Sequence, residues 1–127
     1  MKTRYTVALS VVAGIALGAA MQALHAQTKP KAYTIVENVV NDQNGYMKDC
    51  APAMAKSNED AGAKFLVRGG QIIAVHGAPP PGRVVVVQFD SLDKAQAWVN
   101  SSATKALFAQ CEKYATLHDY LVEGVSQ

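Results

Sequence analysis

Four runs of apolar and β-branched residues alternate along the chain with two stretches in which apolar residues recur every three or four positions. The runs predict β-strands, and the three- and four-residue spacing predicts helices. We expect strands at residues 33–40, 63–68, 83–89 and 116–123, and helices at residues 43–61 and 92–111. The order β-α-β-β-α-β predicts a ferredoxin-like α+β fold, an antiparallel four-stranded sheet with two helices on one face.

Helix-capping and helix-breaking residues refine the two helices. Asn41-Asp42 offers an N-cap for the first helix, and Gly62 is expected to end it. Pro52 lies inside this helix and should kink it, because proline lacks the N–H that the helix needs. The second helix is expected to break near Ser101-Ser102 and then to resume.

Glycines and prolines mark the region between the second and third strands. Gly69-Gly70 predicts a bulge or bend, after which the second strand should resume through residues 72–75. Three consecutive prolines between Gly77 and Gly82 predict a stiff turn into the third strand.

Both faces of the predicted sheet are apolar. Side chains alternate across a strand, and the third strand presents apolar residues on both sides: Val84 and Val86 on one, and Val85, Val87 and Phe89 on the other. A sheet with one solvated face should alternate apolar and polar residues instead. Since two helices cover only one face, we expect a second copy of the sheet to cover the other, which predicts a homodimer.

The first 26 residues have the pattern of a secretory signal peptide. Lys2 and Arg4 precede an uncharged apolar stretch at residues 5–21, and Leu24-His25-Ala26 is the best cleavage site. Residues 27–32 then form a polar tether, and residues 33–125 form the domain. We therefore expect a periplasmic or secreted protein. The alternative is an uncleaved leader that tethers the chain to the membrane.

Removing the leader changes the charge of the protein. Lys2 and Arg4 are two of the twelve basic residues, and all ten acidic residues lie beyond residue 26, so the mature chain has a net charge of 12 − 2 − 10 = 0. A near-neutral domain without a basic stripe is a poor partner for nucleic acid.

Four segments carry a resemblance to a known family. They are Lys-Phe-Leu-Val-Arg-Gly-Gly at residues 64–70, Arg-Val-Val-Val-Val-Gln-Phe at 83–89, Ala-Trp-Val-Asn-Ser at 97–101 and Leu-Val-Glu-Gly at 121–124. Over residues 33–125 the chain resembles domain of unknown function 1330, within the dimeric α/β-barrel superfamily. The resemblance implies a ferredoxin-like monomer that pairs sheet to sheet, and it brings no established reaction.

Two positions depart from the pattern of that family. Residues 101–104, Ser-Ser-Ala-Thr, stand where the family usually has Ser-Pro-x-Tyr after the tryptophan, and His118 stands where a basic residue, commonly arginine, is expected. An imidazole at this place would make an anion site pH-dependent.

Cys50 and Cys111 are the only cysteines, and both occupy apolar positions of the predicted helices. The favoured interpretation is two packed thiols in the core. A disulfide is the alternative, because an exported protein meets an oxidising compartment. A reactive thiol is a third, although no His or Lys stands nearby in sequence to lower its pKa.

Polar residues interrupt each predicted strand and supply the candidate site. Glu37, Arg68, Gln88 and His118 would form a row across one face if the strand registers agree. Such a row is either a set of ion pairs, with Arg68 beside Glu37 or at the sheet edge, or a site for an acidic or polar ligand. Trp98 is either a core residue or a wall of that ligand site.

Three functions remain open from the sequence. The first is binding of a small acidic or polar ligand near Arg68 and Trp98, with Glu37 and Gln88 as further candidates. The second is a cofactor-independent monooxygenase- or isomerase-like enzyme, with His118 as base and Arg68 holding a carboxylate or enolate. The third is a structural envelope protein. No metal-ligand spacing and no phosphate loop is present in the sequence, so no cofactor is expected.

Overall fold

An antiparallel sheet of five strands forms the base of the domain in the computed structural model, which describes residues 29–126. The strands are β1 (Ala32–Val40), β2 (Lys64–Arg68), β3 (Arg83–Phe89), β4 (Ala115–Thr116) and β5 (Asp119–Glu123). Strand β1 pairs with β3 on one side and with β4 and β5 on the other, and β2 pairs with β3. This strand order confirms the ferredoxin-like α+β prediction, although the last strand, predicted as one element at residues 116–123, is divided into β4 and β5 and the sheet has five strands instead of four. The leader predicted at residues 1–26 lies outside the described residues.

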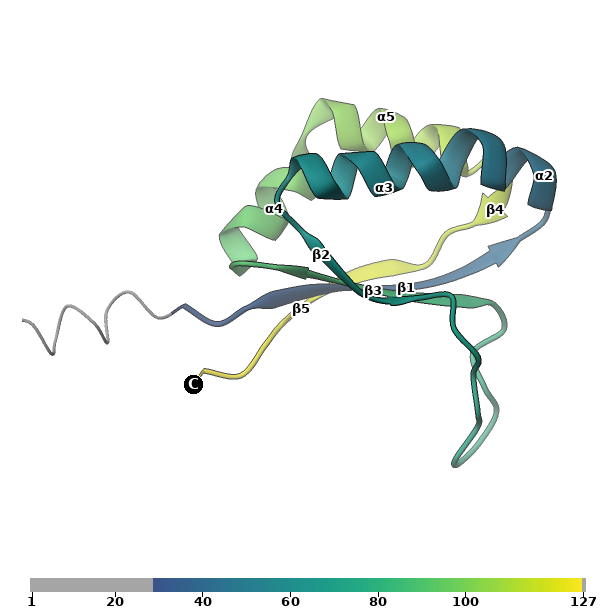
Figure 1. The fold of residues 1–127 in the computed structure, drawn as a ribbon, viewed down its shortest axis with the longest axis horizontal. Coiled ribbons are helices and arrows are strands. Elements are labelled where there is room, and N and C mark those ends of the chain that lie inside the picture. The colour runs from purple at the N-terminus through teal and green to yellow at the C-terminus, as the bar shows by residue number, and fades with distance from the viewer. Residues whose placement is uncertain (1–28, 127) are drawn as a thin grey trace, which may run out of the picture. The chain divides into compact units, whose positions relative to one another are not determined.

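The helices all lie on one face of the sheet (Figure 1). The first helical segment is continuous through α2 (Gln43–Gly45), a π-helical turn η1 (Tyr46–Cys50) and α3 (Ala51–Asp60). The second comprises α4 (Leu92–Asn100) and α5 (Ser102–Cys111). Beneath them, Val85, Val87 and Phe89 of β3 form the centre of the core with Ala32 and Ala95.

Local sequence explains where the helices begin and change. The Asp42 carboxylate accepts a hydrogen bond from the Gly45 N–H at 3.0 Å and so caps α2, as predicted. Pro52, predicted to kink the middle of a helix, lies in the first turn of α3 and follows a π-helical turn in which the Ala51 N–H bonds to the Tyr46 carbonyl. Ser101 ends α4 and caps α5, which confirms the predicted break between them.

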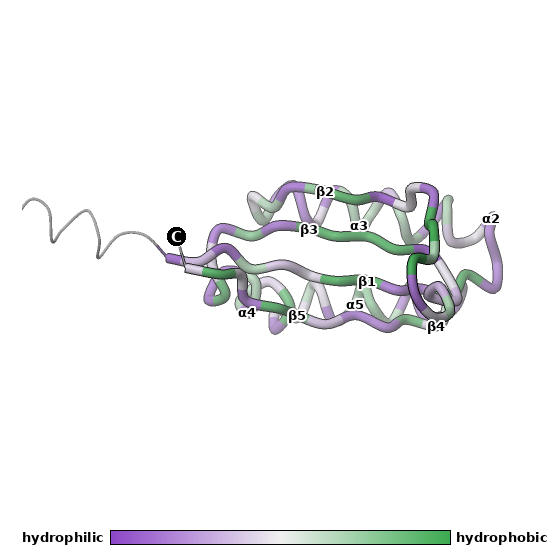
Figure 2. The backbone as a smooth tube through the Cα atoms, turned by 90° about the horizontal axis from the view of Figure 1, so that it is seen from below, coloured by the Kyte–Doolittle hydropathy of each residue, from purple (hydrophilic) through white to green (hydrophobic). Residues whose placement is uncertain are grey.

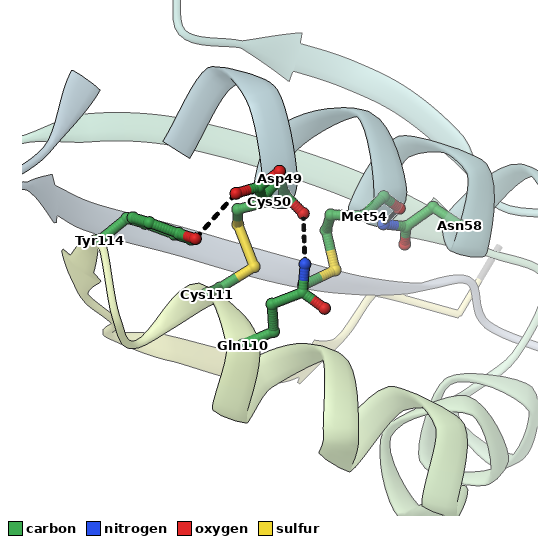
Figure 3. The surroundings of a disulfide bond; sticks show 7 residues. All are labelled: Asp49, Cys50, Met54, Asn58, Gln110, Cys111 and Tyr114. Carbon is green, nitrogen blue, oxygen red and sulfur yellow. Dashed lines mark hydrogen bonds between the residues drawn. A yellow bond between two sulfur atoms is a disulfide. The ribbon is translucent and has the colours of Figure 1, made fainter. Parts of the chain in front are cut away.

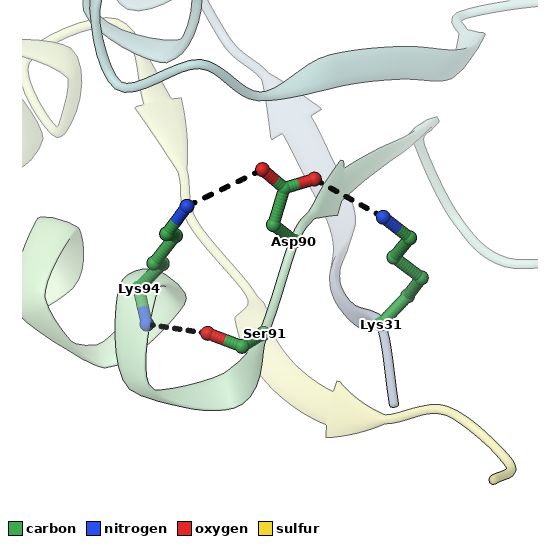
Figure 4. A network of polar contacts seen from close by, with 4 residues as sticks. All are labelled: Lys31, Asp90, Ser91 and Lys94. Carbon is green, nitrogen blue, oxygen red and sulfur yellow. Dashed lines mark hydrogen bonds and ion pairs between the residues drawn. The ribbon is translucent and has the colours of Figure 1, made fainter. Parts of the chain in front are cut away.

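An exposed network of charges fixes the start of α4 against β1 (Figure 4). Asp90 accepts hydrogen bonds from Lys31 at 3.1 Å and from Lys94 at 3.4 Å, and the two ammonium groups lower the pKa of its carboxyl. The Ser91 side chain accepts from the Lys94 N–H and caps the helix. Because these ion pairs are exposed to solvent, they contribute little to the free energy of folding.

The second strand is shorter than predicted. It ends at Arg68, and Gly69 follows with a φ of 67°, a conformation that turns the chain out of the sheet. The prediction that the strand resumes through residues 72–75 is therefore wrong. Residues 69–82 instead form a loop that projects on the side away from the helices (Figure 1), and Val75 within it is 97% exposed.

The cysteines form a disulfide, so the favoured interpretation of two free thiols is wrong (Figure 3). Cys50 and Cys111 lie at the ends of η1 and α5, where the Cα atoms approach to 5.0 Å and the sulfurs are bonded at 2.06 Å. Around the bond, Asp49 accepts hydrogen bonds from the Tyr114 hydroxyl at 2.8 Å and from the Gln110 amide at 2.9 Å. The two helical segments are thus joined covalently and by hydrogen bonds at one end.

Candidate functional site

A cavity of about 440 Å³ lies between the helices and the covered face of the sheet. Its walls are mostly apolar side chains contributed by both layers, among them Val36, Phe65 and Val85 from the sheet and Met54, Trp98 and Phe108 from the helices. We call this cavity the interior cleft. Its volume and apolar lining are those of a pocket for a small organic molecule.

Trp98 serves both as a core residue and as a wall of the cleft. Its ring packs against Phe89 at a centroid distance of 5.4 Å and against Phe108 at 6.0 Å. The indole Nε1–H donates to the Ser57 hydroxyl at 2.9 Å, which fixes the ring against α3. One edge of the ring still lines the interior cleft.

Asn58 supplies an unsatisfied acceptor inside the domain. The residue is 2% exposed, and its amide NH₂ donates to the Met54 carbonyl at 2.9 Å. Its Oδ1 is buried and has no hydrogen-bond partner among residues 29–126. An unmade hydrogen bond of this kind costs about 1–3 kcal/mol. Sequence reasoning missed this residue, although its spacing of four from Met54 placed a polar side chain on the apolar face of the helix.

Asp119 stands at the mouth of the same cleft on β5. The residue is exposed, yet the surrounding protein removes enough water from the carboxyl to raise its pKa to about 6. The charge of the neighbouring His118 opposes this shift. The apolar cleft therefore has a carboxyl group that changes charge close to neutral pH.

The raised pKa of Asp119 predicts a pH-dependent stability. The folded chain binds this proton more tightly than the unfolded chain, where the pKa is near 3.8, so stability should fall as pH rises from about 4 to about 6. The variant Asp119→Asn removes this titration. We expect the free energy of unfolding by urea, measured across that range, to decline more steeply for the unmodified chain than for the variant. Parallel profiles would contradict the raised pKa.

The predicted row of polar residues is divided between the two faces. Glu37, Gln88 and His118 lie on the face away from the helices, and the His118 ring contacts a Glu37 carboxylate oxygen at 3.3 Å and the Tyr120 ring at a centroid distance of 5.9 Å. Arg68 pairs with the buried Val85 and so lies on the helix side. A β-bulge between Phe65 and Val67 changes the register and separates Arg68 from the other three.

Residues 29–126 contain no group of three or more His, Cys, Asp or Glu side chains that could hold a metal ion. Within the same residues, no helix has the length and apolar character needed to cross a bilayer.

Solved structures with a similar fold have little sequence in common with the chain. A protein of unknown function from Rhodopseudomonas palustris aligns with a TM-score of 0.52 and 10% identity, over 78% of this chain and 85% of its own. A conserved protein of unknown function from Bacteroides thetaiotaomicron, described as a possible oxidoreductase, aligns with a TM-score of 0.51 and 10% identity, over 75% of this chain and 98% of its own. SnoaB, a cofactor-independent oxygenase from Streptomyces nogalater, aligns with a TM-score of 0.47 and 7% identity, over 77% and 96%. At 10% identity, the first two alignments show a shared fold alone.

The sequence comparisons are more specific. No curated protein sequence matches the chain. The family described as domain of unknown function, DUF1330, matches residues 31–125, a range that contains all five strands of the sheet and both helical segments. Because this match extends over most of the sequence and agrees with the ferredoxin-like fold, the chain belongs to the DUF1330 family.

Proposed function

We propose that the protein binds a small, largely apolar molecule with a hydrogen-bond donor in the interior cleft. Two observations carry the proposal: an apolar cavity of about 440 Å³ with Asn58 in its wall, and the buried, unpartnered Oδ1 of that residue. Most buried polar groups have a hydrogen-bond partner, so an unpaired one calls for an explanation, and a bound molecule that donates to it supplies one. A purely structural envelope protein would give no reason for such an acceptor.

The test uses a fluorescent probe with these properties, N-phenylnaphthylamine, which has an apolar body and one N–H. Trp98 is the only tryptophan of the chain and lines the cleft, so energy transfer from it to the probe reports binding at this place. We expect saturable binding, and we expect Asn58→Leu to weaken it about 3- to 10-fold through the loss of one hydrogen bond.

The matched control is the N-methylated probe, which has no donor. Its affinity should be the same for the unmodified chain and for Asn58→Leu, because neither complex contains the hydrogen bond. Absence of energy transfer from Trp98, or an equal loss for both probes, would contradict binding through Asn58.

One observation favours a second function, proton abstraction from a bound substrate. Asp119, with a pKa of about 6 at the edge of an apolar cleft, fits the properties of a general base better than His118, whose ring lies on the opposite face of the sheet. Deuterium exchange into an apolar ketone in D₂O separates this function from binding alone, since only a base in the cleft accelerates the exchange.

We also propose that a second copy of the chain covers the sheet face opposite the helices. Figure 2 views this face and shows a long hydrophobic stretch along β3 and a shorter one in the middle of β1. The strand registers place a wholly apolar row across its middle: Tyr120, Ile35, Val86 and Val67. The polar residues lie towards the two ends of the strands: Gln88 and Lys64 at one, and Glu37 and His118 at the other. An apolar centre with a polar rim is the anatomy of a protein interface.

The disulfide supports the proposal that the protein is exported. Disulfides persist in the periplasm and outside the cell and are rare in the cytosol. The bond between Cys50 and Cys111 therefore agrees with the signal peptide predicted at residues 1–26. We propose a periplasmic or secreted protein, tethered to the membrane only if the leader is retained.

A further inference from the structure

A second cavity lies next to the interior cleft. Met54, Phe65 and Val85 line both spaces, and the second, of about 270 Å³, lies between the helical segment η1–α3 and strands β2 and β3. Arg68 and Arg83 are the charged residues of its lining. We call this second cavity the arginine end.

Neither arginine is neutralised by the described part of the chain. Among residues 29–126 no carboxylate forms an ion pair with Arg68 or Arg83. The Nε of Arg83 is buried and has no hydrogen-bond partner within the described residues, and the Arg68 guanidinium stacks 4.3 Å from the centroid of the Phe65 ring. Two guanidinium groups that share a cavity and lack acidic partners leave their donors available to an anion.

The backbone beside the arginine end is shaped around Arg83. Gly69 has a φ of 67°, and a Cβ added to it would lie 2.7 Å from an Nη atom of Arg83. A side chain at this position would therefore displace the guanidinium. Glycine allows the turn and lets the guanidinium lie against the backbone.

The charges of the two cavities have opposite signs. Arg68 belongs to β2 at one edge of the sheet, whereas Asp119 belongs to β5 at the other edge and lines the interior cleft together with Glu112. A negatively charged group on a bound molecule is repelled from the acidic side and attracted to the arginines. The charges therefore favour one orientation of a bound molecule, with its negative group towards the arginines.

We propose that the natural ligand is a small amphipathic carboxylic acid whose apolar body lies in the interior cleft and carries the donor for Asn58, while its carboxylate is bound by Arg68 and Arg83. This proposal rests on the proposed binding function and adds the chemical class of the ligand. Guanidinium groups bind carboxylates through paired, charge-assisted hydrogen bonds.

The test compares two probes that differ only in the terminal group, pyrenebutyrate and the neutral pyrenebutanol. Energy transfer from Trp98 to pyrene reports binding of each to the full mature chain. We expect the dissociation constant of the acid to be lower than that of the alcohol by a factor of about 10 or more, because only the acid forms charge-assisted hydrogen bonds. Arg83→Met should abolish this preference and leave the affinity for the alcohol within about 2-fold. Arg68→Met is a second, independent variant with the same expectation.

The matched control is Lys105→Met, which removes the same charge from an exposed position on α5. It should leave the preference for the acid intact. Equal affinities of the two probes for the unmodified chain would overturn the arginine end as a carboxylate site, while binding of the alcohol would still support the cleft. Loss of the preference in Lys105→Met would show unspecific attraction of anions and would also overturn it. If neither pyrene probe binds although N-phenylnaphthylamine does, only the arginine end is overturned. If none of the three binds, the proposed binding function itself fails.

Discussion

Replacing both cysteines, Cys50→Ala with Cys111→Ala, is expected to lower the free energy of unfolding by about 4 kcal/mol. The bond connects positions 61 residues apart, and breaking it releases a loop of that size in the unfolded chain. For a domain of this length, the loss corresponds to a fall in melting temperature of about 15–30 °C. Urea unfolding of the mature chain with and without the two substitutions measures the difference.

A reducing agent separates the bond from the packing of its side chains. Added to the unmodified chain, it should reproduce most of the loss, and added to the double variant it should change nothing. A double variant within about 1 kcal/mol of the unmodified chain would contradict the expected effect. Because α3 and α5 both line the interior cleft, we also expect N-phenylnaphthylamine to bind more weakly once the bond is broken.

The disulfide also shows what could not be predicted from the sequence. Helical spacing placed both cysteines on buried helix faces, and both are buried. The distance between two helices, however, depends on how each packs on the sheet, which the spacing of residues along one helix does not contain. The strand of four valines was different: its apolar run identified β3 from Arg83 to Phe89 at both ends.

The candidate site was also predicted only in part, because it depends on how strands and helices are placed relative to one another. Two of the predicted ligand residues line cavities: Trp98 lines the interior cleft, and Arg68 lines the arginine end. The row of polar residues depended on register, and one β-bulge moved Arg68 to the other face. Arg83 and Asn58 were overlooked because the apolar residues around them were sufficient to predict the strand and the helix. Neither polar side chain was needed for that prediction. Only the missing partners of their buried atoms single them out.

Placing a charge at the centre of the uncovered sheet face is expected to convert a dimer into a monomer. Val86 lies in the apolar row, between Ile35 on β1 and Val67 on β2. Through two-fold symmetry, Val86→Arg puts two arginines into the interface, and each buried, unpaired charge costs several kcal/mol. The dissociation constant should therefore rise by about 100-fold or more. Sedimentation of the mature chain at micromolar concentration should give twice the monomer mass, and the variant should give the monomer mass.

The single chain should tolerate this substitution, because its helices cover the opposite face and Val86 contributes to no buried core cluster of the domain. Circular dichroism should accordingly be the same for both proteins. Ala109→Arg, at an exposed position of α5, adds the same charge outside the face and should remain dimeric. A monomeric unmodified chain would contradict the proposal that the sheet pairs with a second copy. It would also leave Tyr120, Val122 and Val67, each more than 40% exposed, to be covered by a different partner.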